Sequence, residues 1–190
     1  MRLSPIPLLH RLRALVTPGT LRIGARARIA AGARLAFRRG SLTIGREARL
    51  HHGALIDALR GRVVIGDNFS LNPYSIVYGL GDVTIGDDVR VAAHVVVVAF
   101  DHNVEDRARP IRMQGVTKKP VVIESDVWIG AGARILGGSH VRRGCVVGAN
   151  AVLKGDTEPY GIYVGNPARL LRFRGASSRV AVPHDGLEAS

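Results

Sequence analysis

The sequence predicts an all-β fold: a parallel β-helix of about six coils with one extruded loop and short terminal extensions. Aliphatic residues recur at every sixth position late in the chain, at Ile123, Ile129, Ile135, Val141, Val147 and Leu153. Earlier, the same spacing recurs in triplets, of which Ile23, Ile29 and Leu35 are the first. A six-residue spacing fits no helical face, and the β-branched run at residues 95–98 favours strands.

Each hexad predicts a short strand followed by a corner. A small or apolar residue stands two positions before most anchors, as at Val121 and Val127, which is the alternation of a strand. Glycine often follows the anchor, as at Gly130 and Gly148, and permits a sharp turn. Three hexads make one coil, and stacked coils bury one another's anchors, so each coil needs neighbours for stability.

The composition indicates one domain with an anionic partner. The chain has 190 residues, 46% of them hydrophobic, and a formal charge of +12. The repeat domain is expected at residues 21–172, after an N-terminal extension at 1–20 and before a mobile tail at 173–190. The single cysteine, Cys145, excludes an internal disulfide. No apolar run reaches the length of a membrane span, so a cytoplasmic protein is expected.

The N-terminal extension is the segment with a case for membrane contact. Residues 5–16 form a basic amphipathic pattern that favours a short helix, which either lies on an anionic membrane or packs on its own domain. Nucleic acid is the least favoured anionic partner, because aromatic residues are only 5% of the chain and no recognisable binding module interrupts the repeat.

Two stretches resemble the hexapeptide-repeat acyltransferases: Val-Val-Ile-Glu-Ser-Asp-Val-Trp-Ile-Gly-Ala-Gly-Ala at 121–133 and Tyr-Val-Gly-Asn-Pro-Ala-Arg at 163–169. The resemblance extends from about Leu21 to Arg172 and is to the sugar and polysaccharide O-acetyltransferases of the galactoside, maltose and colanic-acid group. It implies a left-handed coil, a homotrimer with active sites between subunits, acetyl-CoA as acyl donor, and a sugar or envelope-glycan precursor as acceptor.

The interruption of the repeat carries the candidate catalytic base. The period stops after Val97 and resumes at Val121, so the insert at about 98–120 must leave the stack, where loops often carry function. A hydroxyl that attacks a thioester needs a base, and histidine titrates near neutral pH. His102 lies at the position of the family's catalytic histidine. Asp101, Glu105 or a backbone carbonyl could orient its imidazole.

The resemblance also implies binding residues. Asn72 matches the family's acceptor-binding asparagine; the alternative is a turn residue or an internal side-chain ladder. Ala131 and Ala149 match positions whose backbone lines the pantetheine arm of coenzyme A. Lys154, Arg169 and Arg172 match basic residues near its phosphates; each alone could equally be a solvated cation.

Other candidate residues receive no role. Arg107, Arg109 and Arg112 in the insert are read as solvated, and Trp128 is expected to point outward. The remaining candidate histidines are read as surface or packing residues: His51, His52, His94, His140 and His184. No metal is expected, because γ-class carbonic anhydrases of this coil have two zinc histidines five residues apart, whereas His94 and His102 are eight apart.

The sequence therefore predicts an acetyl-CoA-dependent O-acetyltransferase in which His102 acts as general base within a ternary complex. A covalent route through Cys145 is disfavoured, because that residue occupies an inward repeat position. Two alternatives stay open: an N-acetyltransferase of the same fold and a noncatalytic β-helix scaffold.

Overall fold

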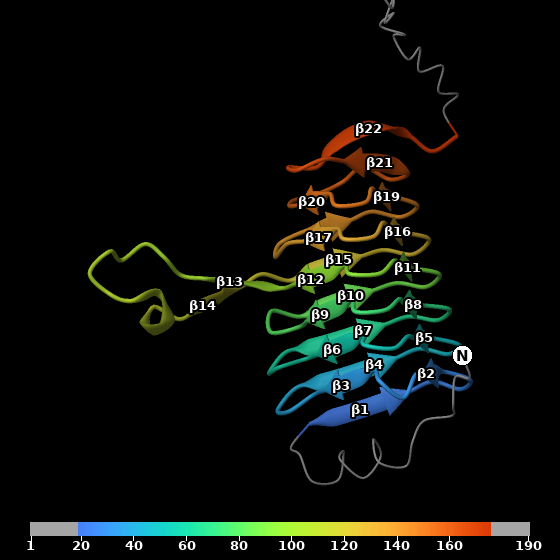
Figure 1. Ribbon diagram of the computed structural model, residues 1–190, viewed down its shortest axis with the longest axis horizontal. Helices are drawn as coiled ribbons and strands as arrows, with labels where there is room; N and C mark the ends of the chain where they lie inside the picture. Colours follow the sequence, from blue (N-terminus) through green and yellow to red (C-terminus); the bar gives the residue numbers. More distant parts are fainter. Residues whose placement is uncertain (1–18, 176–190) are drawn as a thin grey trace, which may run out of the picture.

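A computed structural model describes residues 19–175 and shows three parallel sheets wound around one axis (Figure 1). The first sheet contains β1 (Thr20–Ile23), β4 (Ser41–Ile44), β7 (Arg62–Ile65), β10 (Val83–Ile85), β15 (Val121–Ile123) and β18 (His140–Val141). The second contains β2 (Arg28–Ile29), β5 (Arg49–Leu50), β8 (Ser70–Leu71), β11 (Arg90–Val91), β16 (Trp128–Ile129), β19 (Val146–Val147), β21 (Gly161–Val164) and β22 (Arg169–Phe173). The third contains β3 (Arg34–Ala36), β6 (Leu55–Asp57), β9 (Ile76–Tyr78), β12 (Val96–Val98), β17 (Arg134–Ile135) and β20 (Val152–Leu153).

One strand from each sheet makes one coil, and six coils stack in register. β1 to β3 form coil 1, and β18 to β20 form coil 6. The anchors of the six-residue period lie in line: Ile23 pairs with Ile44, and Ile44 pairs with Ile65. The predicted parallel β-helix of about six coils is therefore confirmed; its left-handed sense stays an expectation from the resemblance.

The anchors fill the interior of the coil. Ile29, Ile56 and Ile129 have no exposed surface, and the smaller residues two positions earlier, such as Val127 and Ala133, are buried beside them. Cys145 is one of these inward residues, as predicted. Each coil thus covers the apolar ends of the next, which is why the repeats fold together and not singly.

Because each coil contributes one strand to each of three sheets, it has a triangular outline with three corners. The corners differ, and two of them matter for function. Where the second sheet passes into the third, alanines occupy the first turn position in four coils, so this corner is here called the alanine edge: Ala31, Ala93, Ala131 and Ala149. Where the third sheet passes into the first, the insert leaves the stack, and this corner is called the arm edge. Nine residues separate Leu35 from Ile44 across the arm edge, against six between Ile135 and Val141, so the lower coils are wider there.

The last strand reverses direction. β22 runs antiparallel to β21 at the end of the second sheet, and Arg174 Nη1 reaches Asp126 Oδ2 at 2.9 Å. The regular repeat did not predict this strand. The expected N-terminal helix at 5–16 lies outside the described residues, and so does the expected tail at 173–190 apart from its first three residues, of which Phe173 ends β22. Within the described part, no helix is long and apolar enough to cross a membrane.

Candidate active site

The insert forms a β-hairpin arm that projects from the arm edge (Figure 1). Its strands are β13 (Phe100–His102) and β14 (Val116–Lys118), and a short 3-10 helix, η1 (Ile111–Met113), lies in the connection. At the neck, Lys119 N donates to Ala99 O at 2.9 Å, so the coil continues almost as if the arm were absent. The predicted extruded loop is therefore confirmed, and its strands give it a defined orientation.

The hairpin register decides which way His102 points. Phe100, Asp101 and His102 lie opposite Lys118, Thr117 and Val116, respectively. Because directly opposed residues project to the same face of a hairpin and neighbours to opposite faces, His102 shares a face with Val116 and Lys118. Asp101 and Thr117 belong to the other face.

On that other face, the polar neighbours of His102 in the sequence, Asp101 and Asn103, make contacts with other residues of the insert. Asp101 Oδ2 lies 2.6 Å from Lys119 Nζ. Thr117 Oγ1 donates to Asn103 Oδ1 at 2.6 Å. In residues 19–175, no hydrogen bond joins the His102 imidazole to Asp101 or Glu105. Of the partners considered for His102, Asp101 is thus engaged elsewhere.

The connection is braced by one glutamine. Gln114 Nε2 donates to the carbonyls of Asp106 and Arg109, each at 2.8 Å, and its Oε1 accepts from Asp106 N at 3.0 Å. Arg109 Nη2 also donates to Met113 O, so this arginine is partly used within the loop. The arm therefore holds its own shape and presents exposed apolar side chains at Val104, Ile111 and Met113.

Asn72 lies on the alanine edge, one coil corner away from the arm edge. Its Nδ2 donates to Val91 O of the next coil at 2.8 Å, so one side-chain hydrogen bond joins coils 3 and 4 here. The amide is partly buried beside a recess of about 240 Å³ that Arg49, His51 and Ser70 also line. Because only one of the two N–H groups of the amide is used internally, the second N–H and the carbonyl oxygen remain for an acceptor.

Ala131 and Ala149 are exposed and stacked one coil apart on the same edge. Asn150 N donates to Ala131 O at 2.8 Å, and Gly132 N donates to Ala93 O at 2.9 Å. The alanines of coils 4 to 6 thus form a track of small side chains along this edge, next to coil 3, which holds Asn72. In the described part of the chain the N–H of Ala131 donates to no backbone acceptor, so it is available to an oxyanion.

The three cations that were predicted to bind phosphate lie near the C-terminal end of the stack, on different elements. Lys154 follows β20 at the arm edge, whereas Arg169 and Arg172 lie on β22. Both arginines donate to neighbouring backbone carbonyls, and none of the three joins an ion pair within residues 19–175. Their charges are therefore open to an anionic group.

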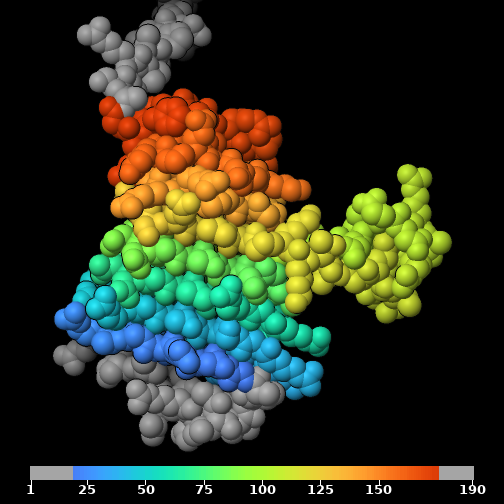
Figure 2. Space-filling view, turned by 180° about the vertical axis from the view of Figure 1, so that it is seen from behind, coloured from blue at the N-terminus to red at the C-terminus, as the bar shows by residue number. Residues whose placement is uncertain are grey.

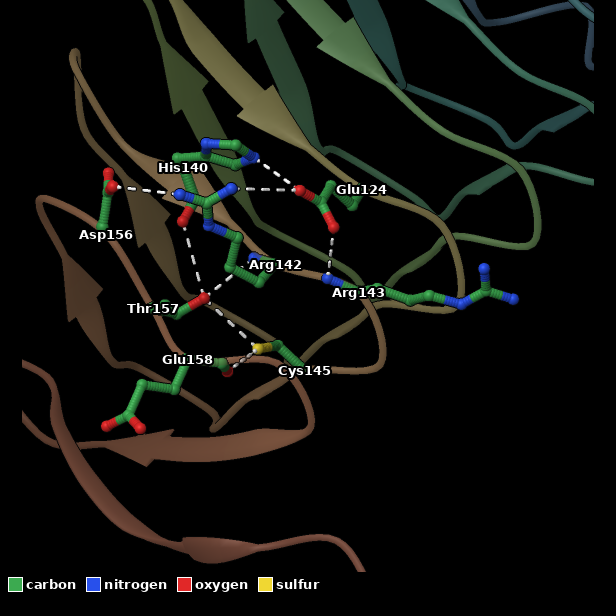
Figure 3. Close-up of polar contacts among 8 residues, drawn as sticks. All are labelled: Glu124, His140, Arg142, Arg143, Cys145, Asp156, Thr157 and Glu158. Atoms are coloured by element: carbon green, nitrogen blue, oxygen red, sulfur yellow. Dashed lines mark hydrogen bonds and ion pairs between the residues drawn. The ribbon is translucent and has the colours of Figure 1, made fainter.

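A polar cluster on the first sheet was not predicted (Figure 3). His140 Nε2 lies 2.7 Å from Glu124 Oε1, and Arg143 N donates to Glu124 Oε2 at 2.9 Å. That backbone hydrogen bond, and then His140, lower the pKa of the Glu124 carboxyl below its ordinary value of 4.5. Arg142 lies between Glu124 and Asp156 at 3.5 and 3.4 Å. The signal was available, because Glu124 and Arg142 are one 18-residue coil apart.

The cluster extends to the buried thiol of Cys145. Cys145 Sγ lies 3.2 Å from Thr157 Oγ1 and donates to Glu158 O at 2.9 Å, with the thiol buried. Across residues 19–175, no group of three or more histidine, cysteine or acidic side chains is arranged to hold a metal ion. Trp128 projects outward from the second sheet with 55% of its surface exposed, as predicted.

The class of protein follows from these features: a hexapeptide-repeat β-helix with a histidine-bearing arm. A family model described as bacterial transferase hexapeptide (six repeats) matches residues 120–155. Residues 120–155 of the chain therefore match the repeat of the bacterial hexapeptide transferases.

This chain matches only part of the length of its curated relatives. A probable acetyltransferase of Mycobacterium tuberculosis is 42% identical over 49% of this chain and 31% of the relative. A putative lipopolysaccharide biosynthesis O-acetyl transferase, WbbJ, of Escherichia coli is 29% identical over 56% of this chain and 58% of the relative. The chain thus spans between about a third and somewhat more than half of the length of these relatives.

Solved structures match over more of the chain. A mutant of AntD, an N-acyltransferase from Bacillus cereus in complex with dTDP and coenzyme A, has a TM-score of 0.76 and 21% identity and covers 93% of both chains. A maltose O-acetyltransferase from Clostridium difficile 630 has a TM-score of 0.61 and 26% identity over 68% of both chains. The fold is therefore shared with AntD over nearly the whole chain and with the maltose O-acetyltransferase over about two thirds of it.

Proposed function

We propose that the protein is an acetyl-CoA-dependent O-acetyltransferase that acts on a hydroxyl of a sugar or an envelope-glycan precursor. The observation that carries this proposal is the placement of His102 on a structured arm that stands clear of the coil. The imidazole is exposed and makes no hydrogen bond to Asp101, so it is free to accept a proton from an acceptor hydroxyl.

The step is a direct transfer. His102 takes the proton as the hydroxyl oxygen attacks the thioester carbonyl carbon; the carbon–sulfur bond breaks, and the proton passes from the imidazolium to the leaving thiolate. The products are an ester and free coenzyme A. The N–H of Ala131 is the proposed donor to the oxyanion that forms in between.

The site needs two copies of the chain in this proposal. His102 is on the arm edge, whereas Asn72 and Ala131 are on the alanine edge, and these edges are different corners of the β-helix. We therefore infer that the arm of one subunit reaches the alanine edge of a neighbour, in a homotrimer. The exposed apolar residues of the arm, Val104, Ile111 and Met113, fit this role, since such side chains favour burial against a partner.

Coenzyme A fits the alanine edge. The short side chains of Ala131 and Ala149 leave room beside the backbone for a narrow chain, and Lys154, Arg169 and Arg172 supply charge for its phosphates. N-acyl transfer is the second candidate function, favoured by the fold shared with an N-acyltransferase. His102 would take a proton from an amine in the same way.

The test is release of free thiol from acetyl-CoA by the wild type and by His102→Ala, with hydroxyl and amino sugars as separate acceptors. Acceptor-dependent turnover that falls by about a hundredfold or more in the folded variant supports the proposal. Turnover with amino sugars alone would replace O-acetylation by N-acetylation. Absence of both turnover and coenzyme A binding in the wild type would favour a scaffold role.

A further inference from the structure

A basic hollow lies between the arm and the lower coils at the arm edge, and it is here called the arm pocket. Its volume is about 820 Å³. Four cations line it: Arg38, Arg39, Arg60 and Lys118. In Figure 2 the arm stands out from the coil on the same side as the projecting edge of the lower coils, with open space between them.

One side of the arm pocket is formed by the hairpin that carries the candidate base, His102. Val116 and Lys118 line the pocket from β14, and Val116 is the residue directly opposite His102 in the hairpin. Opposed residues project to the same face, so the face that carries His102 is the face turned toward the pocket. A molecule bound in the arm pocket would therefore contact the face of the arm that carries His102.

The positive charge of the arm pocket is not neutralised by the residues that line it. Four cations and one carboxylate, Asp57, give a net charge of +3. Asp57 Oδ1 already accepts from Leu59 N at 2.8 Å, and within residues 19–175 no ion pair includes any of the four cations. The sequence contains no acidic residue before Glu47.

The rest of the lining is apolar. Leu59, Leu80 and Val116 separate the cations, so the pocket offers hydrocarbon surface next to a strong positive charge. Arginine side chains bind phosphate oxygens through paired N–H donors, and a charge of +3 suits a doubly charged group better than a single carboxylate. The preferred ligand is therefore a phosphate or diphosphate group next to an apolar or aromatic part.

We propose that the arm pocket binds the diphosphate of a glycosyl diphosphate acceptor and thereby holds the sugar beside His102. This inference rests on the proposed function, because it names the class of acceptor for that same base. The diphosphate lies among Arg38, Arg60 and Lys118, and the group that it links to the sugar, whether a nucleoside or a prenyl chain, lies on Leu59 and Leu80. The charge of the N-terminal coils then serves substrate selection.

The first test measures binding without any reaction. Inorganic pyrophosphate is titrated calorimetrically into the full chain, into Arg38→Gln/Arg60→Gln, and into the control Arg22→Gln/Arg28→Gln, which removes the same charge from exposed strands outside the pocket. The pocket variant is expected to bind at least about tenfold more weakly than the wild type, since two charge-assisted contacts are lost. The control should stay within about twofold, because distant charges are screened.

Equal weakening in the two variants, or no measurable binding by the wild type, would overturn the arm pocket as an anion site. Circular dichroism and thermal unfolding of both variants establish that each is folded. The exposed position of all four substituted arginines makes a loss of folding in one variant alone unexpected.

The second test separates the two sources of the diphosphate. A uridine diphosphate hexose and a farnesyl-diphospho-hexose are compared as ligands and as acceptors with acetyl-CoA. Tighter binding of either one than of pyrophosphate supports the acceptor assignment and identifies the linked group. If both bind no better than pyrophosphate, the assignment of the pocket to the acceptor is wrong.

The same experiments distinguish failure of this inference from failure of the proposed function. Thiol release with an uncharged sugar, together with thermal stabilisation by coenzyme A, reports on acetyl transfer without the arm pocket. Transfer to uncharged sugars that is insensitive to Arg38→Gln/Arg60→Gln, with no preference for diphosphates, would leave acetyl transfer standing and remove the arm pocket from it.

Discussion

Asp101 and Lys119 pair across the neck of the arm, with Oδ2 and Nζ 2.6 Å apart, on the face opposite His102. The acidic neighbour of the candidate base therefore fixes the arm to the coil and does not orient the imidazole. This arrangement differs from a histidine–carboxylate dyad, in which the carboxylate contacts the ring and stabilises its charged form.

The first prediction is that Asp101→Asn keeps most of the activity. Both partners of the ion pair are more than a third exposed, so the pair contributes little to stability, and Asp101 makes no hydrogen bond to the His102 ring. We expect kcat/KM to fall by less than about threefold, against about a hundredfold for His102→Ala. The acid limb of the pH–rate profile should stay where it is in the wild type.

A matched control is Lys119→Gln, which removes the other partner of the same pair. Similar small losses in both variants would assign the pair to the neck of the arm. A loss in Asp101→Asn as large as in His102→Ala, together with a shifted pH profile, would show that the carboxylate acts on the imidazole after all.

The second prediction is that Cys145→Ala turns over acetyl-CoA at nearly the wild-type rate. The thiol is buried inside the coil and bonded to Thr157 and Glu158, so it cannot reach a thioester at the surface. We expect kcat within about threefold of the wild type and no acetylated cysteine in the intact mass of protein quenched during turnover. A competent acetyl adduct on Cys145 would contradict the direct-transfer mechanism.

The third prediction concerns the alanine edge. Ala131→Leu places a long side chain on the track where the pantetheine arm is proposed to lie, so coenzyme A binding should weaken by about tenfold or more. Ala31→Leu is the matched control, because Ala31 is also exposed and has the same turn position in coil 1. Thermal shift with coenzyme A measures both. Equal binding by the two variants would place the cofactor elsewhere.

The period of six predicts most of the fold because each hexad encodes the same strand and corner. The 18-residue coil then fixes which residues stack, as for Val122 and His140, which are partners in the register. The break in the period predicts the arm and the position of His102. These features are local or strictly repeated, so they can be read without knowledge of distant contacts.

The features that escaped prediction depend on distant contacts. The direction of His102 follows from the hairpin register, which the Gln114 contacts help to fix. The arm pocket brings Arg38 together with Lys118, 80 residues later in the sequence. Its signal was the nine-residue spacing from Leu35 to Ile44, which widens the arm edge. β22 reverses direction and so lies outside any parallel repeat.

The fourth prediction concerns stability in acid. The pKa of Glu124 is lowered in the folded protein, chiefly by the hydrogen bond from Arg143 N and then by His140. A carboxyl group whose pKa is lower in the folded than in the unfolded state stabilises the fold above its unfolded pKa, and the stabilisation disappears as the pH falls through the folded pKa. Glu124→Gln should therefore destabilise the protein at pH 7, by about 1 kcal/mol or less because the pair is partly exposed.

The measurement is the urea midpoint of wild type and Glu124→Gln at fixed protein concentration, from pH 7 down to about pH 3. The gap between the two midpoints should narrow below the ordinary carboxyl pKa of 4.5 and disappear as the pH falls through the lower pKa of the folded state. Glu158→Gln is the control, since the Glu158 carboxylate points away from the cluster in Figure 3 and should leave the midpoint unchanged at every pH. A gap for Glu124→Gln that stayed constant down to pH 3 would mean that the ionised carboxylate contributes nothing, and that the cluster is held by neutral hydrogen bonds alone.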